Sequence, residues 1–141
     1  MDFGKMIKGM KPRIFIIEDD KSISGLLSET LQIAGFEVEV FDSGGRAIKA
    51  IQEIHEGSKQ KPHLILLDLI LPDMNGIEIL KEARKYPQTR NVKIYALTNY
   101  SNPDFNEELM KEGIDKILIK VQYTLEELVT VVKEATKNET E

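Results

Sequence analysis

Short apolar runs of β-strand length alternate with amphipathic helical patterns along this chain. We predict strands over 13–17, 36–41, 63–67, 92–97 and 117–119. Apolar residues at helical spacing follow each strand, over 21–34, 75–85 and 102–112 and in stripes that begin at Ala47 and Leu125. Alternation at this spacing implies right-handed βαβ crossovers. It therefore predicts an α/β fold, a doubly wound parallel sheet with helices on both faces.

Two of these segments carry finer expectations. In the helix over 21–34, the spacing places Ile23, Leu26, Leu27 and Leu31 on one buried face. The strand over 36–41 alternates between apolar and charged residues, which is typical of an edge strand with one wetter face. Three polar residues are predicted to cap the helices that follow them: Ser43, Asn102 and Thr124.

Length and composition indicate one globular domain. The chain has 141 residues, and we expect a domain over 12–136, a short N-terminal extension over 1–11 and a frayed tail over 137–141. A net charge of −5 argues against a protein that coats nucleic acid. The chain has no cysteine and no apolar run near the length of a membrane span, so we expect no membrane partner and a cytoplasmic protein.

Functional side chains stand where four of the predicted strands end. Glu18 and Asp19 follow the first strand, and Asp68 follows the third. Thr98 closes the fourth strand and Lys120 the fifth. In an open α/β sheet the carboxyl ends of the strands form the ligand-binding edge, so we expect these groups to meet there.

Together these residue types suit phosphoryl transfer. Neighbouring carboxylates repel one another, and a hard divalent cation such as Mg²⁺ removes the conflict. A carboxylate such as Asp68 can then act as a nucleophile toward phosphorus, with Lys120 as a counter-charge and the Thr98 hydroxyl as a donor. Each residue alone has an ordinary structural reading, because Asp favours turns and acidic residues favour helix starts. Their joint occurrence at four strand ends favours function.

Four segments of the chain resemble the receiver domains of bacterial two-component response regulators, across about residues 12–136. They are 13–20 (RIFIIEDD), 64–76 (LILLDLILPDMNG), 96–98 (ALT) and 117–120 (ILIK). The resemblance implies a flavodoxin-like (βα)5 fold with strand order 2-1-3-4-5. It also implies a stand-alone regulator, similar to the chemotaxis regulators, whose output is contact with an unknown protein partner.

The resemblance also assigns roles to residues. Asp68 would take a phosphoryl group from a phosphohistidine on a sensor histidine kinase or a His-containing phosphotransfer protein. Asp19, with Glu18 nearby and the backbone carbonyl of Ile70, would join Asp68 in binding Mg²⁺ or Mn²⁺. Thr98 and Lys120 would hold the phosphoryl oxygens. Such a receiver is a phosphoacceptor with self-catalysed transfer and slow autodephosphorylation, not an enzyme with turnover.

Three positions depart from the family pattern. Ile117 stands at the switch position, where an aromatic residue usually reports the movement of the Thr. Val121 follows Lys120 where a cis-proline is common, and a cis bond before a non-proline residue costs about 2.5–4 kcal/mol. We therefore expect trans bonds over 120–124. Asn99 replaces a small residue, and we expect it either to crowd the entry of the phosphate or to add a hydrogen bond.

Two other functions remain open at this point. A pseudo-receiver scaffold would suit Ile117 and Val121, although the complete set of acidic, Thr and Lys residues argues against it. A small phosphatase with an aspartyl nucleophile would need a second acid two positions later, where this chain has Ile70.

Ile70 and Tyr100 are predicted to slow hydrolysis of the aspartyl phosphate, because these bulky side chains would flank the path of the attacking water. The half-life of the phosphorylated protein should exceed that of an Ile70→Asn, Tyr100→Glu double variant by about tenfold, or about 1.4 kcal/mol in the barrier. Decay of the phosphorylated form after removal of the donor measures both. Equal half-lives would refute this role of the two residues.

Overall fold

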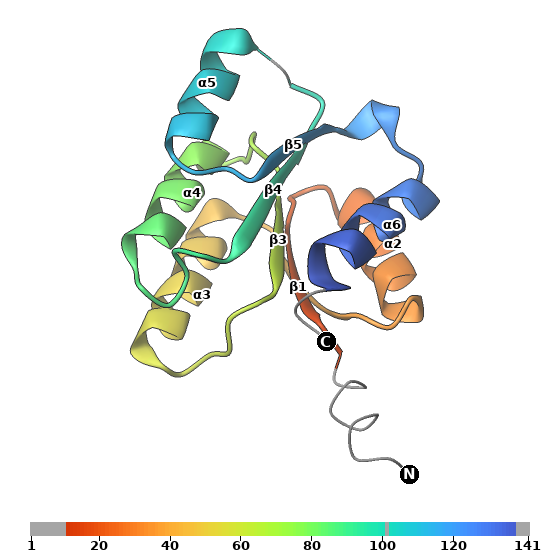
Figure 1. Cartoon of the computed structure of the whole chain (residues 1–141), viewed down its shortest axis with the longest axis horizontal. Helices are drawn as coiled ribbons and strands as arrows, with labels where there is room; N and C mark the ends of the chain where they lie inside the picture. Colours follow the sequence, from red (N-terminus) through yellow and green to blue (C-terminus); the bar gives the residue numbers. More distant parts are fainter. Residues whose placement is uncertain (1–10, 101, 138–141) are drawn as a thin grey trace.

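A computed structural model describes residues 11–100 and 102–137 of the chain (Figure 1). Element labels follow Figure 1, in which the first labelled helix is α2. The strands are β1 (Arg13–Ile17), β2 (Glu37–Phe41), β3 (Leu64–Leu67), β4 (Lys93–Thr98) and β5 (Lys116–Ile119). The helices are α2 (Lys21–Ile33), α3 (Gly44–Glu56), α4 (Gly76–Lys85), α5 (Pro103–Lys111) and α6 (Leu125–Thr136), and a short 3₁₀ turn, η1 (Lys120–Gln122), precedes α6.

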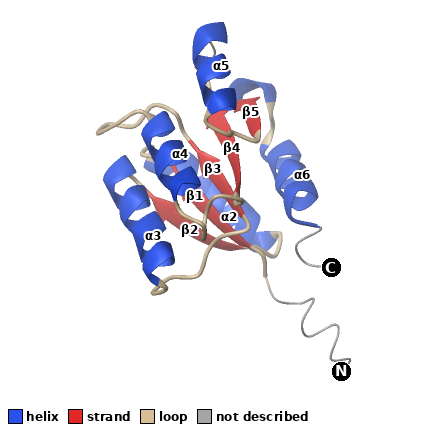
Figure 2. Cartoon of the chain, turned by 60° about the vertical axis from the view of Figure 1, so that its left-hand side comes forward, coloured by secondary structure: helices blue, strands red, loops and turns tan. Residues whose placement is uncertain are grey.

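The strands form one parallel sheet of order β2-β1-β3-β4-β5. This confirms the predicted α/β fold and the strand order implied by the family resemblance. Helices α3, α4 and α5 cover one face of the sheet, and α2 and α6 cover the other (Figures 1 and 2). The sheet separates two apolar cores, the first beneath α3, α4 and α5 and the second beneath α2 and α6. Along β1, Phe15 and Ile17 pack into the first core, whereas Ile14 and Ile16 pack into the second. A central strand buried on both faces has to be apolar at every position, which explains its continuous apolar run.

The edge position predicted for the alternating strand is confirmed. Strand β2 pairs with β1 at one border of the sheet. Glu37 and Val40 are exposed, whereas Phe41 is buried against Phe15 with the ring centroids 4.9 Å apart. The charged residues of β2 therefore occupy positions that the covered central strands do not offer.

The predicted buried face of α2 is partly wrong. Leu27 and Leu31 are buried as expected, but Ile23 is 41% exposed and Leu26 is 54% exposed. Ser24 is buried in their place, so the inward stripe runs through Ser24, Leu27 and Leu31. Apolar spacing predicted too wide a stripe, because only the narrow line at positions i, i+3 and i+7 of the helix is buried.

The predicted helix caps are confirmed. The Ser43 hydroxyl accepts a hydrogen bond from the Arg46 N–H at 3.2 Å. Asn102 caps α5 through the N–H groups of residues 104 and 105. Thr124 and Glu127 form a reciprocal capping box at the start of α6. Each cap satisfies backbone donors that the first helical turn leaves without partners.

The predicted extension over 1–11 and tail over 137–141 lie almost wholly outside the described residues, and the domain bounds at 12 and 136 stay predictions. Among the described residues, no helix is both long and apolar enough to cross a membrane.

Arg84, near the end of α4, ties two loops to the amino ends of β4 and β5. Its guanidinium donates to the carbonyl oxygens of Val92 at 2.7 Å and Gly113 at 2.8 Å. It also pairs with the Asp115 carboxylate at 3.0 Å, and that carboxylate accepts the Ile94 N–H at 2.8 Å. A planar fork of N–H donors can satisfy several carbonyls at once, which a lysine cannot do.

Replacing Arg84 should destabilise the fold. We expect Arg84→Ala to lower the free energy of unfolding by about 2–3 kcal/mol, because the carbonyls of Val92 and Gly113 would lose a charged donor. Arg84→Lys should recover less than half of that loss, since it restores the charge without the fork. Urea denaturation measures both variants. The exposed Arg90 side chain supplies the control, and Arg90→Ala should stay within about 0.5 kcal/mol of wild type. An equally small effect of Arg84→Ala would contradict this role.

Candidate functional site

The predicted strand-end residues meet at the carboxyl edge of the sheet. Glu18 continues β1, and its N–H donates to the Phe41 carbonyl at 3.0 Å. Asp68 continues β3, and its N–H donates to the Ile17 carbonyl at 2.9 Å. Thr98 is the last residue of β4 and is paired in register with Ile119, one residue before Lys120. The parallel register thus brings together four segments that lie far apart in the sequence.

Three carboxylates form the acidic part of this group. One oxygen from each of Glu18, Asp19 and Asp68 lies within 4.8 Å of the other two. Glu18 is 5% exposed and Asp68 is 9% exposed, whereas Asp19 is exposed. Burial raises the pKa of the Glu18 carboxyl above its ordinary value, the hydrogen bond from Lys120 opposes this rise, and the nearby Asp68 charge adds to it. A site with this charge balance suits a cation.

Lys120 is the basic partner of the buried carboxylates. Its Nζ donates to Glu18 Oε1 and lies 3.7 Å from Asp68 Oδ2. The Lys120 side chain is 18% exposed, so water screens these interactions only in part. Lys120 therefore stands beside the one carboxylate, Asp68, that is predicted to react.

Thr98 and Ile70 complete the surroundings of Asp68. Thr98 is 1% exposed, and its hydroxyl oxygen accepts the Tyr100 N–H at 3.1 Å. A hydroxyl that accepts in this way keeps its own hydrogen for donation. The Ile70 N–H donates to Asp68 Oδ1 at 3.2 Å. Ile70 is 61% exposed and Tyr100 is 44% exposed, and the Tyr100 ring packs edge-on against Phe105 with the centroids 5.6 Å apart.

Asp20 and Asp42 have other roles. Asp20 caps α2 by accepting the N–H groups of Ser22 at 2.9 Å and Ile23 at 3.2 Å. Asp42 follows the edge strand β2 and pairs with Arg46 on α3 at 3.4 Å. Asp20 and Asp42 thus form local contacts with α2 and α3, and they are not part of the group of three carboxylates.

The turn after β3 is held by contacts that sequence reasoning missed. Asp73 accepts the N–H groups of Gly44 and Gly45, both at 2.9 Å, and these hydrogen bonds lower the pKa of its carboxyl. A Cβ on Gly44 would lie 2.3 Å from Met74, and one on Gly76 would lie 2.8 Å from the Asp68 carbonyl. The available signal was Gly76 at the end of the Pro-Asp-Met-Asn-Gly turn, whereas nothing in the sequence placed Gly44 and Gly45 beside Asp73. This packing fixes the backbone on the carboxyl side of Asp68.

The three departures from the family pattern have structural counterparts. Ile117 is half-buried and packs against the first core. The trans expectation for 120–124 is confirmed, since the described residues contain no cis peptide bond. Asn99 forms a hydrogen bond, but with the protein: its Oδ1 accepts the Val121 N–H at 3.0 Å.

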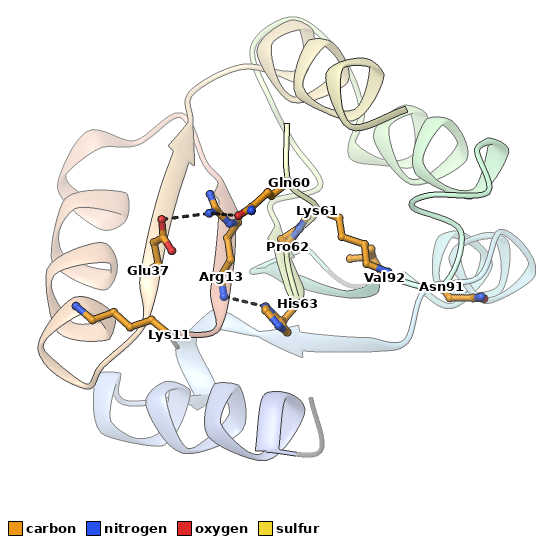
Figure 3. A pocket seen from close by; sticks show the side chains of 9 residues that line it. All are labelled: Lys11, Arg13, Glu37, Gln60, Lys61, Pro62, His63, Asn91 and Val92. Atoms are coloured by element: carbon orange, nitrogen blue, oxygen red, sulfur yellow. Dashed lines mark hydrogen bonds and ion pairs between the residues drawn. The ribbon is translucent and has the colours of Figure 1, made fainter. Parts of the chain in front are cut away.

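A separate hollow of about 700 Å³ lies at the opposite, amino-terminal end of the strands (Figure 3). Arg13 projects into it but is already bonded to Gln60 at 2.7 Å and Glu37 at 3.2 Å. His63 Nδ1 accepts the Arg13 N–H at 2.9 Å. None of the predicted strand-end residues lines this hollow, so it is separate from the site at the carboxyl edge.

Comparison with known proteins gives one consistent result. The sequence pattern of the response regulator receiver domain matches residues 14–133. The phosphate regulon transcriptional regulatory protein PhoB of Rhizobium meliloti (strain 1021) is 32% identical over 124 residues, which cover 88% of this chain and 52% of PhoB.

Solved structures agree with this family. A CheY-like response regulator receiver domain protein from Methanospirillum hungatei JF-1 has a TM-score of 0.79 and 26% sequence identity, covering 91% of this chain and 95% of that chain. The Mn(2+)-bound form of response regulator Rcp1 has a TM-score of 0.74 and 28% identity, covering 92% of this chain and 95% of its own.

The sheet order and the acidic, hydroxyl and ammonium groups at its carboxyl edge define a receiver of phosphorelay signal transduction. The chain belongs to the response regulator receiver domain family. It spans about half the length of PhoB, 52%, so the predictions of a stand-alone regulator and of no nucleic-acid partner stay predictions.

As the pH falls, binding of a divalent cation should begin to weaken at a higher pH than it would if Glu18 had the ordinary pKa of a glutamate. The raised pKa of Glu18 means that it takes up a proton earlier as the pH falls, and a protonated carboxyl is a poor ligand. Mn²⁺ titrations between about pH 8 and about pH 5 measure the affinity. Glu18→Gln should weaken binding by about tenfold or more and flatten the pH dependence.

The exposed Glu29 on α2 provides a matched control, and Glu29→Gln should leave both the affinity and its pH dependence unchanged. An unchanged pH profile in Glu18→Gln would contradict the assignment of Glu18 to the cation site.

Proposed function

We propose that Asp68 accepts a phosphoryl group from a phosphohistidine on a sensor histidine kinase or a His-containing phosphotransfer protein. One observation carries the assignment: Lys120 Nζ lies 3.7 Å from Asp68 Oδ2 while it also pairs with the buried Glu18. Asp68 is thus the carboxylate that follows β3, belongs to the acidic group and lies beside the Lys120 ammonium. The family of the chain supports the same assignment.

The acidic group fits a resident metal ion. Glu18, Asp19 and Asp68 offer hard oxygen ligands within 4.8 Å of one another, the donor type that Mg²⁺ and Mn²⁺ prefer. The Ile70 backbone carbonyl would add a further oxygen. A bound ion would neutralise charge on the transferring phosphoryl oxygens. The Mn(2+)-bound form of the similar regulator Rcp1 supports this reading.

Each residue around Asp68 has a separate role in phosphoryl transfer. An Asp68 oxygen forms the new bond to phosphorus while the bond between phosphorus and the histidine nitrogen breaks, and the leaving imidazole keeps the electron pair. The Ile70 N–H holds Asp68 Oδ1 in place at 3.2 Å. Lys120 passes from the carboxylate to a phosphoryl oxygen, and the Thr98 hydroxyl donates to another. These steps require mainly positioning and charge neutralisation.

Exposed apolar side chains around this edge suit the docking of a phosphodonor. Ile23, Leu26 and Ile70 are 41%, 54% and 61% exposed, although most residues of their size are buried in this fold. Phosphorylation would then change a second surface that contacts the downstream partner. Its candidates are Phe105, Glu107, Glu108 and Met110 on α5, of which Met110 is 61% exposed.

The two other functions are less well supported. A phosphatase with an aspartyl nucleophile would need an acid at position 70, where the chain has Ile70. A scaffold that is never phosphorylated would have no use for three carboxylates within 4.8 Å of one another. We therefore propose a phosphoacceptor that transfers the group to itself and loses it slowly, without multiple turnovers.

Incubation with Mg²⁺ and acetyl phosphate should add one phosphoryl group per chain, detected by intact-protein mass spectrometry. Asp68→Asn should abolish the addition, because an amide is a far weaker nucleophile than a carboxylate. Asp42→Asn is a matched control, since Asp42 also follows a strand but lies at the flank, and this variant should be modified like wild type.

Modification of Asp68→Asn to the wild-type level would contradict the assignment. Release of many phosphates per chain in steady state would favour the phosphatase instead.

A further inference from the structure

Asn99 links the two segments that carry Thr98 and Lys120. Its Oδ1 accepts the Val121 N–H at 3.0 Å. Asn99 is the residue after Thr98, and Val121 is the residue after Lys120. The hydrogen bond thus joins the backbone beside both of the groups proposed to hold the phosphoryl oxygens.

This bond continues the β4–β5 pairing beyond the end of the ladder. The last pair in register is Thr98 with Ile119, and β5 ends at Ile119. The turn η1 follows directly, and its N-cap residue Ile119 makes no side-chain cap. The first N–H groups of such a turn lack partners within it. Asn99 supplies an acceptor for one of them from the neighbouring strand.

Asn99 and Val121 are chemically matched. A proline at position 121 would have no N–H for Asn99 to accept, and a small apolar residue at position 99 would leave the Val121 N–H without this acceptor. The two departures from the family pattern therefore meet in a single contact. Ile117, the third departure, has no polar side-chain atom and packs in the core, so it cannot relay movement by hydrogen bonding.

We propose that Asn99 is a positioning residue that couples Thr98 to the Lys120–Gln122 turn, and that phosphorylation changes the surface at Val121 through this coupling. The inference rests on the proposed function, because its input is the Thr98 hydroxyl turning toward a phosphoryl oxygen. The Thr98 hydroxyl accepts the Tyr100 N–H at 3.1 Å, so a turn of Thr98 would also move the backbone of residues 98–100, which includes Asn99. A shift of residues 98–100 would draw Val121, which is 80% exposed, along with Asn99.

Amide hydrogen exchange tests whether the contact exists in solution. Asn99→Ala should raise the exchange rate of the Val121 amide by about tenfold, the factor expected for one net hydrogen bond. Asn91→Ala is the matched control, since it removes an exposed amide side chain from the amino end of the sheet and should not alter Val121 exchange. An unchanged rate in Asn99→Ala would overturn the proposal.

The coupling is tested with Mg²⁺ and beryllium fluoride as the phosphoryl probe, followed by NMR of the backbone amides. In wild type, residues 98–100 and 120–122 should both shift on binding. In Asn99→Ala, the shifts near Asp68 should persist while that of Val121 falls to less than half. Asn99→Ala and Val121→Pro should each lower the affinity for the probe, and to the same extent, because each removes the same hydrogen bond. The double variant should show no further loss of affinity.

The outcomes separate the two claims. Absence of any shift in wild type would contradict the proposed function and the coupling together. A wild-type shift that Asn99→Ala leaves intact at Val121, or fully additive losses in the double variant, would overturn the coupling alone. A purely structural role for Asn99 would change exchange without changing the response of Val121 to the probe.

Discussion

The pairing of the Lys120 ammonium with the carboxylates of Glu18 and Asp68 is the interaction on which the site depends. Glu18 and Asp68 are 5% and 9% exposed, and two buried like charges at this separation would repel each other without a cation. A buried ion pair seldom stabilises a fold more than apolar packing would. Its presence at the end of three different strands is therefore better explained by phosphoryl chemistry than by stability.

The fold supplies the geometry that this interaction requires. The order β2-β1-β3-β4-β5 places β3 between β1 and β4, so Asp68 lies at the centre of the carboxyl edge. Gly76 allows the following turn to approach the Asp68 backbone, and Asp73 ties that turn to the start of α3. The strand order reverses between β1 and β3, and this reversal opens the carboxyl edge to a ligand.

Periodicity in the sequence predicted the sheet and the strand-end residues, because central strands buried on both faces must be apolar until they reach the edge. It could not predict the contacts between side chains of distant segments. Arg84 with Gly113, Asp73 with Gly44, and Asn99 with Val121 all depend on packing that no local pattern records. The exposed positions of Ile23 and Leu26 were missed for a related reason, since apolar spacing does not distinguish a buried helix face from an exposed one.

The most direct test is to locate the phosphoryl group chemically. Borohydride reduces an aspartyl phosphate to the alcohol, so the modified residue can be identified by tandem mass spectrometry after digestion. The account predicts that reduction of the phosphorylated wild-type protein converts residue 68 and leaves Asp19 and Asp42 unchanged. Conversion at another carboxylate, or a phosphoryl group found on a histidine, would contradict the central claim that Asp68 is the phosphoacceptor.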